Sequence, residues 1–161
     1  TGLADTGIID QPGGFGNLPG GEAFIAPLEG TAQGELSVGP PDDPARWWFS
    51  FSDGRLSGIH GDPPFRDRLE QAIAQHDDVR NVAELGVGTN EKASHPDNIL
   101  EAEKILGTVH VALGDSAGFG GAVSVPFHQD YVIWSPSLRL TTPEDEDVNV
   151  LDNGRFLVEP D

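Results

Sequence analysis

The sequence has no cysteine among its 161 residues. This absence excludes disulfide bonds, thiolate metal sites and a cysteine nucleophile, so any bound metal ion must be held by imidazole and carboxylate groups. Such donors favour Zn, Mn, Fe or Co. No apolar run approaches the roughly 18 residues of a membrane span, and the first residues lack the basic and apolar segments of a secretory signal. We therefore expect a cytoplasmic protein with no membrane partner.

Basic residues are scarce as well. Nine Lys and Arg stand against 27 Asp and Glu, which gives a formal net charge of -18, and only Lys92 and Lys104 are lysines. A field of this sign repels nucleic acid and anionic membranes and argues against both as partners. An acidic surface with little lysine is typical of a halophile's protein, which is our expectation; an ordinary acidic protein is the alternative.

The length predicts a single domain over residues 1–161, large enough to bury a core. Residues 1–21 are rich in Gly and Pro and are expected to form a leading loop. Because the sequence starts at Thr1 without an initiating Met, we expect a fragment or domain of a longer protein, or a processed chain.

Apolar segments with strand-like patterning predict a mostly β domain. Strands are expected at residues 23–28, 34–38, 46–51, 56–60, 81–88, 107–114, 126–134, 137–142 and 148–158. Ser52-Asp53-Gly54-Arg55 indicates a hairpin, since Asp-Gly accommodates the positive φ angles of a type I′ turn. Residues 40–44 indicate another turn. The predicted fold class is α+β, with a mixed or antiparallel sheet curled towards a barrel.

One amphipathic helix is predicted over residues 63–76, with Asp62 as its N-cap and two prolines in its first turn. Its apolar residues recur at helical spacing on one face: Phe65, Leu69, Ala72 and Ile73. A short second helix is expected within residues 97–106. Three charged residues there are expected to form a solvated face: Glu101, Glu103 and Lys104.

His128-Gln129-Asp130 is the most informative triplet, and it lies in an apolar segment. On a strand, side chains at i and i+2 point to the same face, about 7 Å apart, close enough to share one cation. A buried aspartate also needs a partner or a metal. An exposed pair on a strand edge is the alternative.

Three further polar residues stand alone within apolar segments: Glu22, Glu84 and His110. A carboxylate buried without a partner is costly. A lone histidine in an apolar strand is commonly a hydrogen-bonded core residue. One cation shared by these residues and the His128 pair would satisfy all of them, whereas a structural interpretation needs a separate explanation for each.

Other candidates carry less chemistry. The glycine-rich segment 114–121 lacks the Lys and Ser/Thr of a phosphate-binding loop and is expected to form a loop at the rim of the site. The remaining histidines lie in polar surroundings and are expected at the surface: His60, His76 and His95.

Four segments of the sequence resemble the M29 metallopeptidases, the aminopeptidase T-like family often labelled leucyl aminopeptidase. The first is similar to the family's Asn-x-Pro…Glu-x-Phe motif: Asn17-Leu18-Pro19-Gly20-Gly21-Glu22-Ala23-Phe24-Ile25-Ala26-Pro27. The others are similar to the segments with a second glutamate, a first histidine and a terminal His-x-Asp pair: residues 83–90, 98–115 and 128–130.

The resemblance implies a cocatalytic site of two divalent ions, Zn, Co or Mn, in which a metal-activated water removes N-terminal residues from small peptides. It implies five ligands: Glu22, Glu84, His110, His128 and Asp130. Glu22 is the expected catalytic residue. A homodimer and a further upstream domain are also implied.

Two departures from the family pattern keep alternatives open. Gly21 stands where the aminopeptidases carry the first of two adjacent glutamates, and Ala117 stands where they carry a tyrosine. One alternative is an Fe(II) ring-cleaving dioxygenase of the dihydroxypyridine type, acting on a small molecule, since His110, His128 and Asp130 would suit a single iron. The other is a non-peptidase metal-binding domain.

Overall fold

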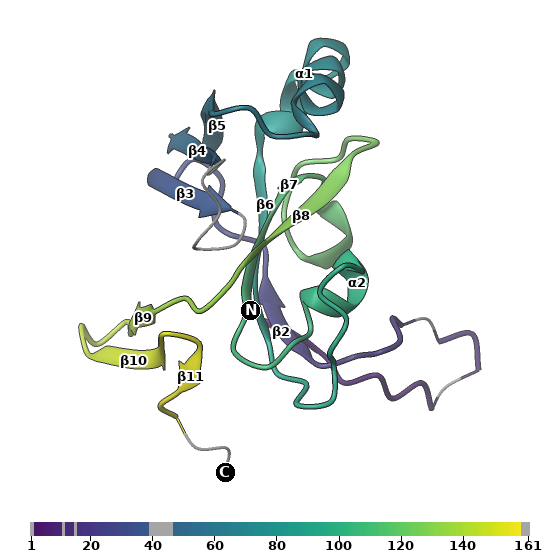
Figure 1. The fold of residues 1–161 in the computed structure, drawn as a ribbon, viewed down its shortest axis with the longest axis vertical. Helices are drawn as coiled ribbons and strands as arrows, with labels where there is room; N and C mark the ends of the chain where they lie inside the picture. Colours follow the sequence, from purple (N-terminus) through teal and green to yellow (C-terminus); the bar gives the residue numbers. More distant parts are fainter. Residues whose placement is uncertain (1, 11, 15, 39–46, 159–161) are drawn as a thin grey trace.

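The computed structural model describes residues 2–10, 12–14, 16–38 and 47–158 (Figure 1). The chain is mostly β, with 39% strand and 14% helix, which confirms the predicted α+β class. The strands pair antiparallel throughout, in three separate sheets instead of one curled sheet. The turn expected at residues 40–44 lies outside the described residues.

The largest sheet has five strands in the order β1-β2-β6-β7-β8. Its strands are β1 Leu3–Asp5, β2 Glu22–Ile25, β6 Val82–Gly88, β7 Val109–Gly114 and β8 His128–Ile133. Four of them were predicted, but β1 lies in the segment predicted to be loop. Its pairing with β2 is extended by the Gly21 amide, which donates to the Asp5 carbonyl at 2.8 Å, so a three-residue strand forms among turn residues.

A three-stranded sheet packs against one end of the long strands (Figure 1). It consists of β3 Gly34–Val38, β4 Trp47–Ser52 and β5 Arg55–His60. The β4–β5 turn is the predicted hairpin, since Asp53 and Gly54 have φ angles of 51° and 73°. The core lies between the two sheets and includes Phe49, Leu56, Leu113 and Tyr131.

Helix α1, Arg66–Gln75, closes this end of the core and buries Leu69. It begins later than predicted, because the two prolines lie in a turn in which the Arg66 amide donates to the Pro63 carbonyl. The first bond of the α-helical type runs from the Leu69 amide to the Phe65 carbonyl. Phe65 therefore occupies the N-cap, without a side-chain cap bond, and the prediction that Asp62 caps the helix is wrong. A 3₁₀ turn, η1 Asp77–Arg80, follows.

The other elements are short. β9 Leu138–Thr141, β10 Asp147–Asp152 and β11 Arg155–Phe156 form the third sheet, at the opposite end of the five-stranded sheet from α1 (Figure 1). α2 is one turn, Ile99–Ala102, capped by Asn98, and η2 spans Ala117–Phe119. No helix in the described part of the chain is long and apolar enough to cross a membrane.

The second predicted helix is largely replaced by an irregular segment that folds back onto the sheet. In the segment after α2, the Lys104 carbonyl accepts a hydrogen bond from the Asn90 amide at 2.9 Å, and the Gly107 amide donates to the Gly88 carbonyl. The backbone is thereby drawn against β6, which buries Glu103 and Lys104. The prediction that these two residues lie on a solvated face is wrong. Among the other histidines, His76 and His95 are exposed as predicted, and His60 is half-buried.

Candidate metal centre

All five predicted ligand residues lie on one face of the five-stranded sheet. Antiparallel partners point to the same side, so the register Glu84–Ala112–Asp130 places both acids together. The partners of the other three are mostly small: Gly88 and Asp5 for Glu22, Gly86 and Val132 for His110, and Gly114 for His128. Strand pairing therefore gathers side chains from β2, β6, β7 and β8.

An irregularity in β6 is part of this arrangement. The register of β6 against β7 shifts between Val82 and Glu84, so that Val82 pairs with Leu113 and Glu84 pairs with Ala112. Without the shift, residues 82 and 84 would share a face. The bulge sends Val82 into the apolar core and Glu84 into the polar centre, as bulges do beside many active sites.

The donor atoms of the five residues converge. His110 Nε2 lies 3.2 Å from Glu84 Oε1 and 3.4 Å from Glu22 Oε2. On the other side of Glu84, His128 Nε2 lies 3.4 Å from Glu84 Oε2 and 3.5 Å from Asp130 Oδ1. Two groups of three result, with their ligand atoms within 4.8 Å of one another: Glu22, Glu84 and His110, and Glu84, His128 and Asp130.

Glycine makes room for the His110 ring. A Cβ placed on Gly86 would meet His110 Nε2 at 2.0 Å, so no larger residue fits opposite the ring without moving it. A Cβ on Gly88 would meet the Ile105 carbonyl at 2.2 Å, in the segment that carries Lys104 towards Glu22. The two glycines of β6 thus allow side chains and backbone from β7 and its preceding segment to lie directly over the sheet.

Sequence reasoning missed two members of the centre. Lys104 is fully buried, and its Nζ lies 2.9 Å from Glu22 Oε1 and also pairs with Glu103. The short α2 turn carries both residues over the sheet. The rarity of lysine could have pointed to Lys104, because one of only two lysines lies in the segment of the first predicted histidine ligand, residues 98–115.

The Glu84 carboxylate is the electrostatic middle of the centre. Burial alone would raise its pKa, but hydrogen bonds from His110 and His128 lower the pKa to about 2. Burial likewise opposes charge on His128, whereas Asp130 and Glu84 raise its pKa to about 10. The pKa of His110 is also raised, against burial, chiefly by the hydrogen bond to Glu84. In the absence of a metal, protons on the imidazoles compensate the carboxylates.

The opposite side of the centre has the reverse tendency. Burial raises the pKa of Glu22, against the hydrogen bond from Lys104. Burial and the nearby Asp130 charge raise the pKa of Glu103 to about 7. The pKa of Lys104 is raised despite its burial, because Glu103 and Glu22 both stabilise its charged form.

A divalent cation fits these residues. Glu22 Oε2, which lies 3.4 Å from His110 Nε2, is buried without a hydrogen-bond partner among the described residues, and unpaired buried polar atoms are rare in native structures. His128 Nδ1 donates to the Asp115 carbonyl at 2.8 Å. This is the support that metal-binding histidines usually have, and it turns Nε2 towards the carboxylates. The carboxylate and imidazole donors indicate a divalent metal.

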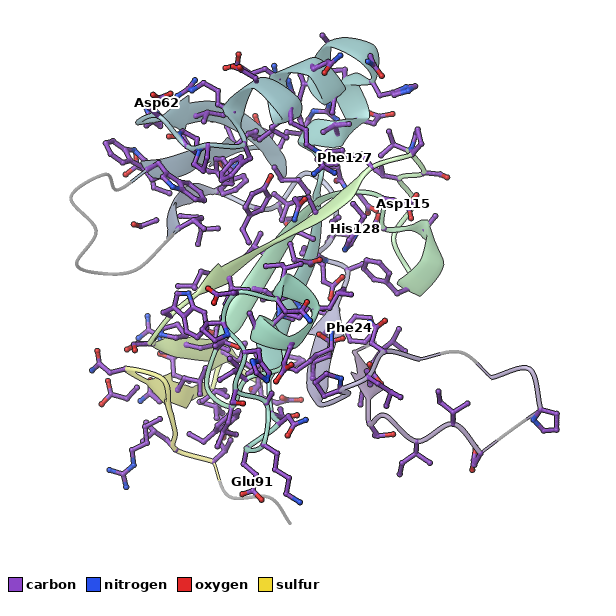
Figure 2. The ribbon with its side chains drawn as sticks, turned by 45° about the vertical axis from the view of Figure 1, so that its right-hand side comes forward. Phe24, Asp62, Glu91, Asp115, Phe127 and His128 are labelled. Atoms are coloured by element: carbon purple, nitrogen blue, oxygen red, sulfur yellow. The ribbon has the colours of Figure 1, made fainter. Side chains whose placement is uncertain are left out.

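The glycine-rich segment borders the centre, as predicted. It supplies the carbonyl of Asp115, which lies beside His128 (Figure 2). Phe119 of η2 lies edge-on to the His128 ring with centroids 5.8 Å apart. Ala117 lies in the same turn. Tyr131 does not replace the tyrosine missing there, because it points to the opposite face of the sheet and packs against Phe49 at 4.8 Å.

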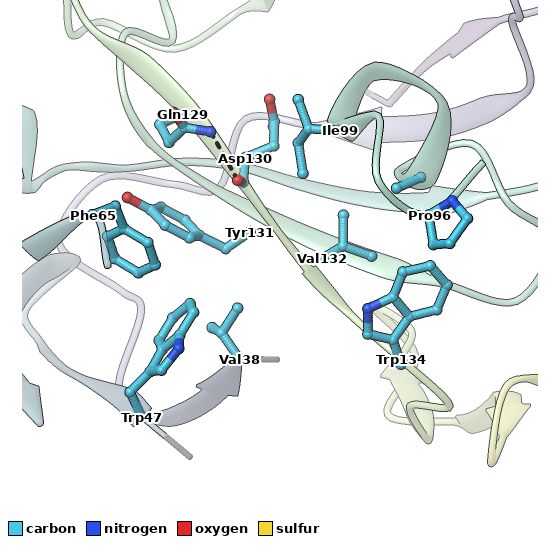
Figure 3. Close-up of a pocket in the computed structure, with 11 residues that line it drawn as sticks. Val38, Trp47, Phe65, Pro96, Ile99, Gln129, Asp130, Tyr131, Val132 and Trp134 are labelled. Atoms are coloured by element: carbon cyan, nitrogen blue, oxygen red, sulfur yellow. Dashed lines mark hydrogen bonds between the residues drawn. The ribbon is translucent and has the colours of Figure 1, made fainter. Parts of the chain in front are cut away.

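A pocket of about 330 Å³ lies along β8 beside Asp130 (Figure 3). Its walls are mostly aromatic and aliphatic: Val38, Trp47, Phe65, Ile99, Tyr131, Val132 and Trp134. Figure 3 shows the Asp130 carboxylate directed towards Ile99 and away from the Trp47 and Phe65 rings. The pocket is therefore apolar, with the strand that bears two of the predicted ligands along one side.

Comparisons with known proteins show which solved structures have a similar fold. No protein-family model and no curated protein matches the chain. A 2,5-dihydroxypyridine dioxygenase from Pseudomonas putida KT2440 matches with a TM-score of 0.79 and 21% identity, over 98% of this chain and 49% of that chain. AmpT from Thermus thermophilus, an M29 aminopeptidase, matches with a TM-score of 0.69 and 17% identity, over 89% of this chain and 41% of that chain.

The fold is common to all three. At these identities the likeness concerns the fold alone, and this chain spans less than half the length of either neighbour. One neighbour is an aminopeptidase and the other a dioxygenase, so the same scaffold carries different chemistries and the site must decide between them.

Proposed function

We propose that the chain carries the metal centre of a hydrolase resembling the M29 aminopeptidases, which removes N-terminal residues from small peptides. The observation that supports this proposal is that two groups of three possible ligands share Glu84, and that Glu22 belongs to one of them. Three carboxylates and two imidazoles in one cluster, buried at Glu22, Glu84 and His110 and more open at His128 and Asp130, suit a Lewis-acidic cation such as Zn, Co or Mn.

The residues divide the work. Glu84, with His128 and Asp130 on one side of it and His110 on the other, would supply the cation ligands, and the cation would polarise a carbonyl and lower the pKa of bound water. Glu22 would act as general base, because its Oε2 faces His110 at 3.4 Å and has no hydrogen-bond partner among the described residues. Lys104 holds the other oxygen, Oε1, at 2.9 Å and so fixes the direction in which Oε2 points.

The apolar pocket suits the side chain of a substrate. Trp47, Phe65 and Trp134 line the pocket, which lies alongside the strand that carries His128 and Asp130. We propose that a small peptide or small molecule places an apolar or aromatic group there, since pockets of this composition bind mainly by burying apolar surface.

A second candidate function is the Fe(II) ring-cleaving dioxygenase. His110, His128 and Asp130 would form the two-histidine, one-carboxylate set of such enzymes. The specific observation in its favour is the dioxygenase neighbour, which matches 98% of this chain against 89% for AmpT. The replacement of the aminopeptidases' Glu and Tyr by Gly21 and Ala117 also favours the dioxygenase.

Two assays on the purified protein distinguish these functions. The protein is stripped with a chelator and reloaded separately with Zn²⁺, Co²⁺, Mn²⁺ and Fe²⁺. Release of N-terminal residues from short peptides with the first three ions would support the hydrolase. Oxygen consumption with a dihydroxypyridine and Fe²⁺ would contradict the hydrolase and support the dioxygenase. Metal binding without either reaction would support the non-peptidase metal-binding domain. Failure to bind any of the four ions would contradict the metal centre itself.

The acidic surface supports a separate proposal, that the protein is adapted to high salt. With a net charge of -18, repulsion between carboxylates disfavours the folded state at low ionic strength. The melting temperature is expected to rise between low and molar KCl. A melting temperature that stays flat across that range would contradict the proposal.

A further inference from the structure

A buried lysine occupies one side of the candidate metal centre. Lys104 is 0% exposed, and its ammonium contacts Glu22 and Glu103. Lysine is almost never buried to this extent without partners, so these two carboxylates are what keeps its charge inside the protein. Among the described residues, Lys104 is the one lysine or arginine that pairs with an acid of the centre.

The two donor groups consequently differ. Glu84, His128 and Asp130 have no cationic lysine or arginine paired with them in the described part of the chain. The group of Glu22, Glu84 and His110 has Lys104 bound to Oε1 of the very carboxylate whose Oε2 completes it. A divalent ion bound to Oε2 and the ammonium bound to Oε1 would share the Glu22 carboxylate. The two positive charges would repel each other strongly, because the low dielectric of a buried site screens them weakly.

We propose that Lys104 takes the place of a second metal ion, so that the centre binds one divalent cation tightly, on the side of Glu84, His128 and Asp130. This proposal rests on the cation centre of the proposed function and concerns its stoichiometry. Three buried carboxylates, the half-buried Asp130 and one ammonium leave three net negative charges when all the carboxylates are ionised and a cation has displaced the protons of the imidazoles. One divalent ion reduces this to a single negative charge, whereas two would reverse its sign beside a buried ammonium.

The experiment counts ions. The purified protein is stripped with a chelator and titrated with Zn²⁺ by calorimetry, and Co²⁺ absorption spectra and elemental analysis after gel filtration provide independent counts. We expect one tightly bound ion per chain in the wild type. In Lys104→Met, which keeps the length of the side chain and removes its charge, we expect two ions, the second bound at least about tenfold more tightly than any second ion of the wild type.

Lys92→Met is the matched control, because it removes the same charge from the exposed second lysine and is expected to leave one ion per chain. If Lys104→Met does not fold, the double variant Lys104→Met/Glu103→Gln also removes one of the two stranded carboxylates and is expected to bind two ions. Circular dichroism checks that each variant folds.

The outcomes separate this inference from the proposed function. Two tightly bound ions in the wild type, or one ion in a folded Lys104→Met, would overturn the role of Lys104 and leave the metal centre standing. No bound ion in the wild type would overturn both. If neither Lys104 variant folds, the wild-type count still decides between one ion and two.

Discussion

The two faces of the five-stranded sheet have opposite chemistry although they are made by the same strands. On β7, Val109, Val111 and Leu113 point to one side, while His110 and Ala112 point to the other. The first face packs against the three-stranded sheet in an apolar core. The second holds charged side chains above glycine and alanine. Because successive side chains of a strand point to opposite faces, neighbouring residues of one strand belong to the core and to the candidate metal centre in turn.

The faces are stabilised by different means. Burial of apolar surface stabilises the core roughly in proportion to area. On the polar face, each buried charge is costly unless it is compensated, and here the carboxylates, imidazoles and Lys104 compensate one another. A change on one face should therefore alter stability, and a change on the other should alter cation binding, which makes the comparison testable.

The largest effect is expected from Phe49→Ala on the apolar side. Phe49 is fully buried at the centre of the core, so the cavity should lower the free energy of unfolding by about 3–5 kcal/mol. Urea unfolding measures the loss, with Leu28→Ala at an exposed position as the control. The number of ions bound per folded chain should not change, and a fall in that number would show that the two faces are coupled.

His128→Ala combined with Asp130→Ala acts on the other side. Both residues are predicted ligands, so cation affinity should fall by more than the roughly 10–100-fold that loss of an outer partner produces. Calorimetric titration with Zn²⁺ gives the affinity. Unchanged metal content and unchanged stability in this variant would mean that the ligand assignment is wrong.

Gly86→Ala tests the space under His110. The added methyl group would overlap the imidazole, so we expect a loss of about 1–3 kcal/mol in stability together with weaker cation binding. Gly118→Ala is the control, because a Cβ there meets nothing within 4 Å. Equal behaviour of the two variants in thermal unfolding and in titration would contradict the close fit.

Per pH unit, the pH dependence of binding should be among the smaller of these effects. The neighbouring Asp130 and Glu84 raise the pKa of His128 to about 10, so at neutral pH a cation must displace a proton. Affinity for Zn²⁺ should therefore rise by about tenfold per pH unit between pH 6 and 8 for each proton displaced. His95→Ala, at an exposed position, should show the same slope.

The same raised pKa has the opposite sign for the stability of the metal-free protein. The contribution of His128 is complete below its unfolded value of 6.5 and is lost as the pH rises through about 10. Thermal unfolding of the stripped protein at several pH values checks this sign, and a melting temperature that increases over that interval would contradict it.

Much of this arrangement follows from local patterns in the sequence. The apolar segments predict β6, β7 and β8, and the spacing of His128 and Asp130 places both on one face, as found. The position of Lys104 could not be derived, because its burial depends on long-range hydrogen bonds from Asn90 and Gly107 that fold the segment after α2 onto β6. The same holds for β1, whose strand structure depends on a partner beyond the turn residues.

The donors of the centre are neighbours in space but distant along the chain, since Glu22 and Asp130 belong to the second and eighth strands. An ion held by Glu84, His128 and Asp130 would fasten β6 and β8 together as a removable cross-link, in a chain that has no cysteine for a covalent one. Because the unfolded chain does not present this site, resistance to unfolding should increase with the logarithm of free cation concentration. Metal availability would then determine the stability of the fold as well as its chemistry.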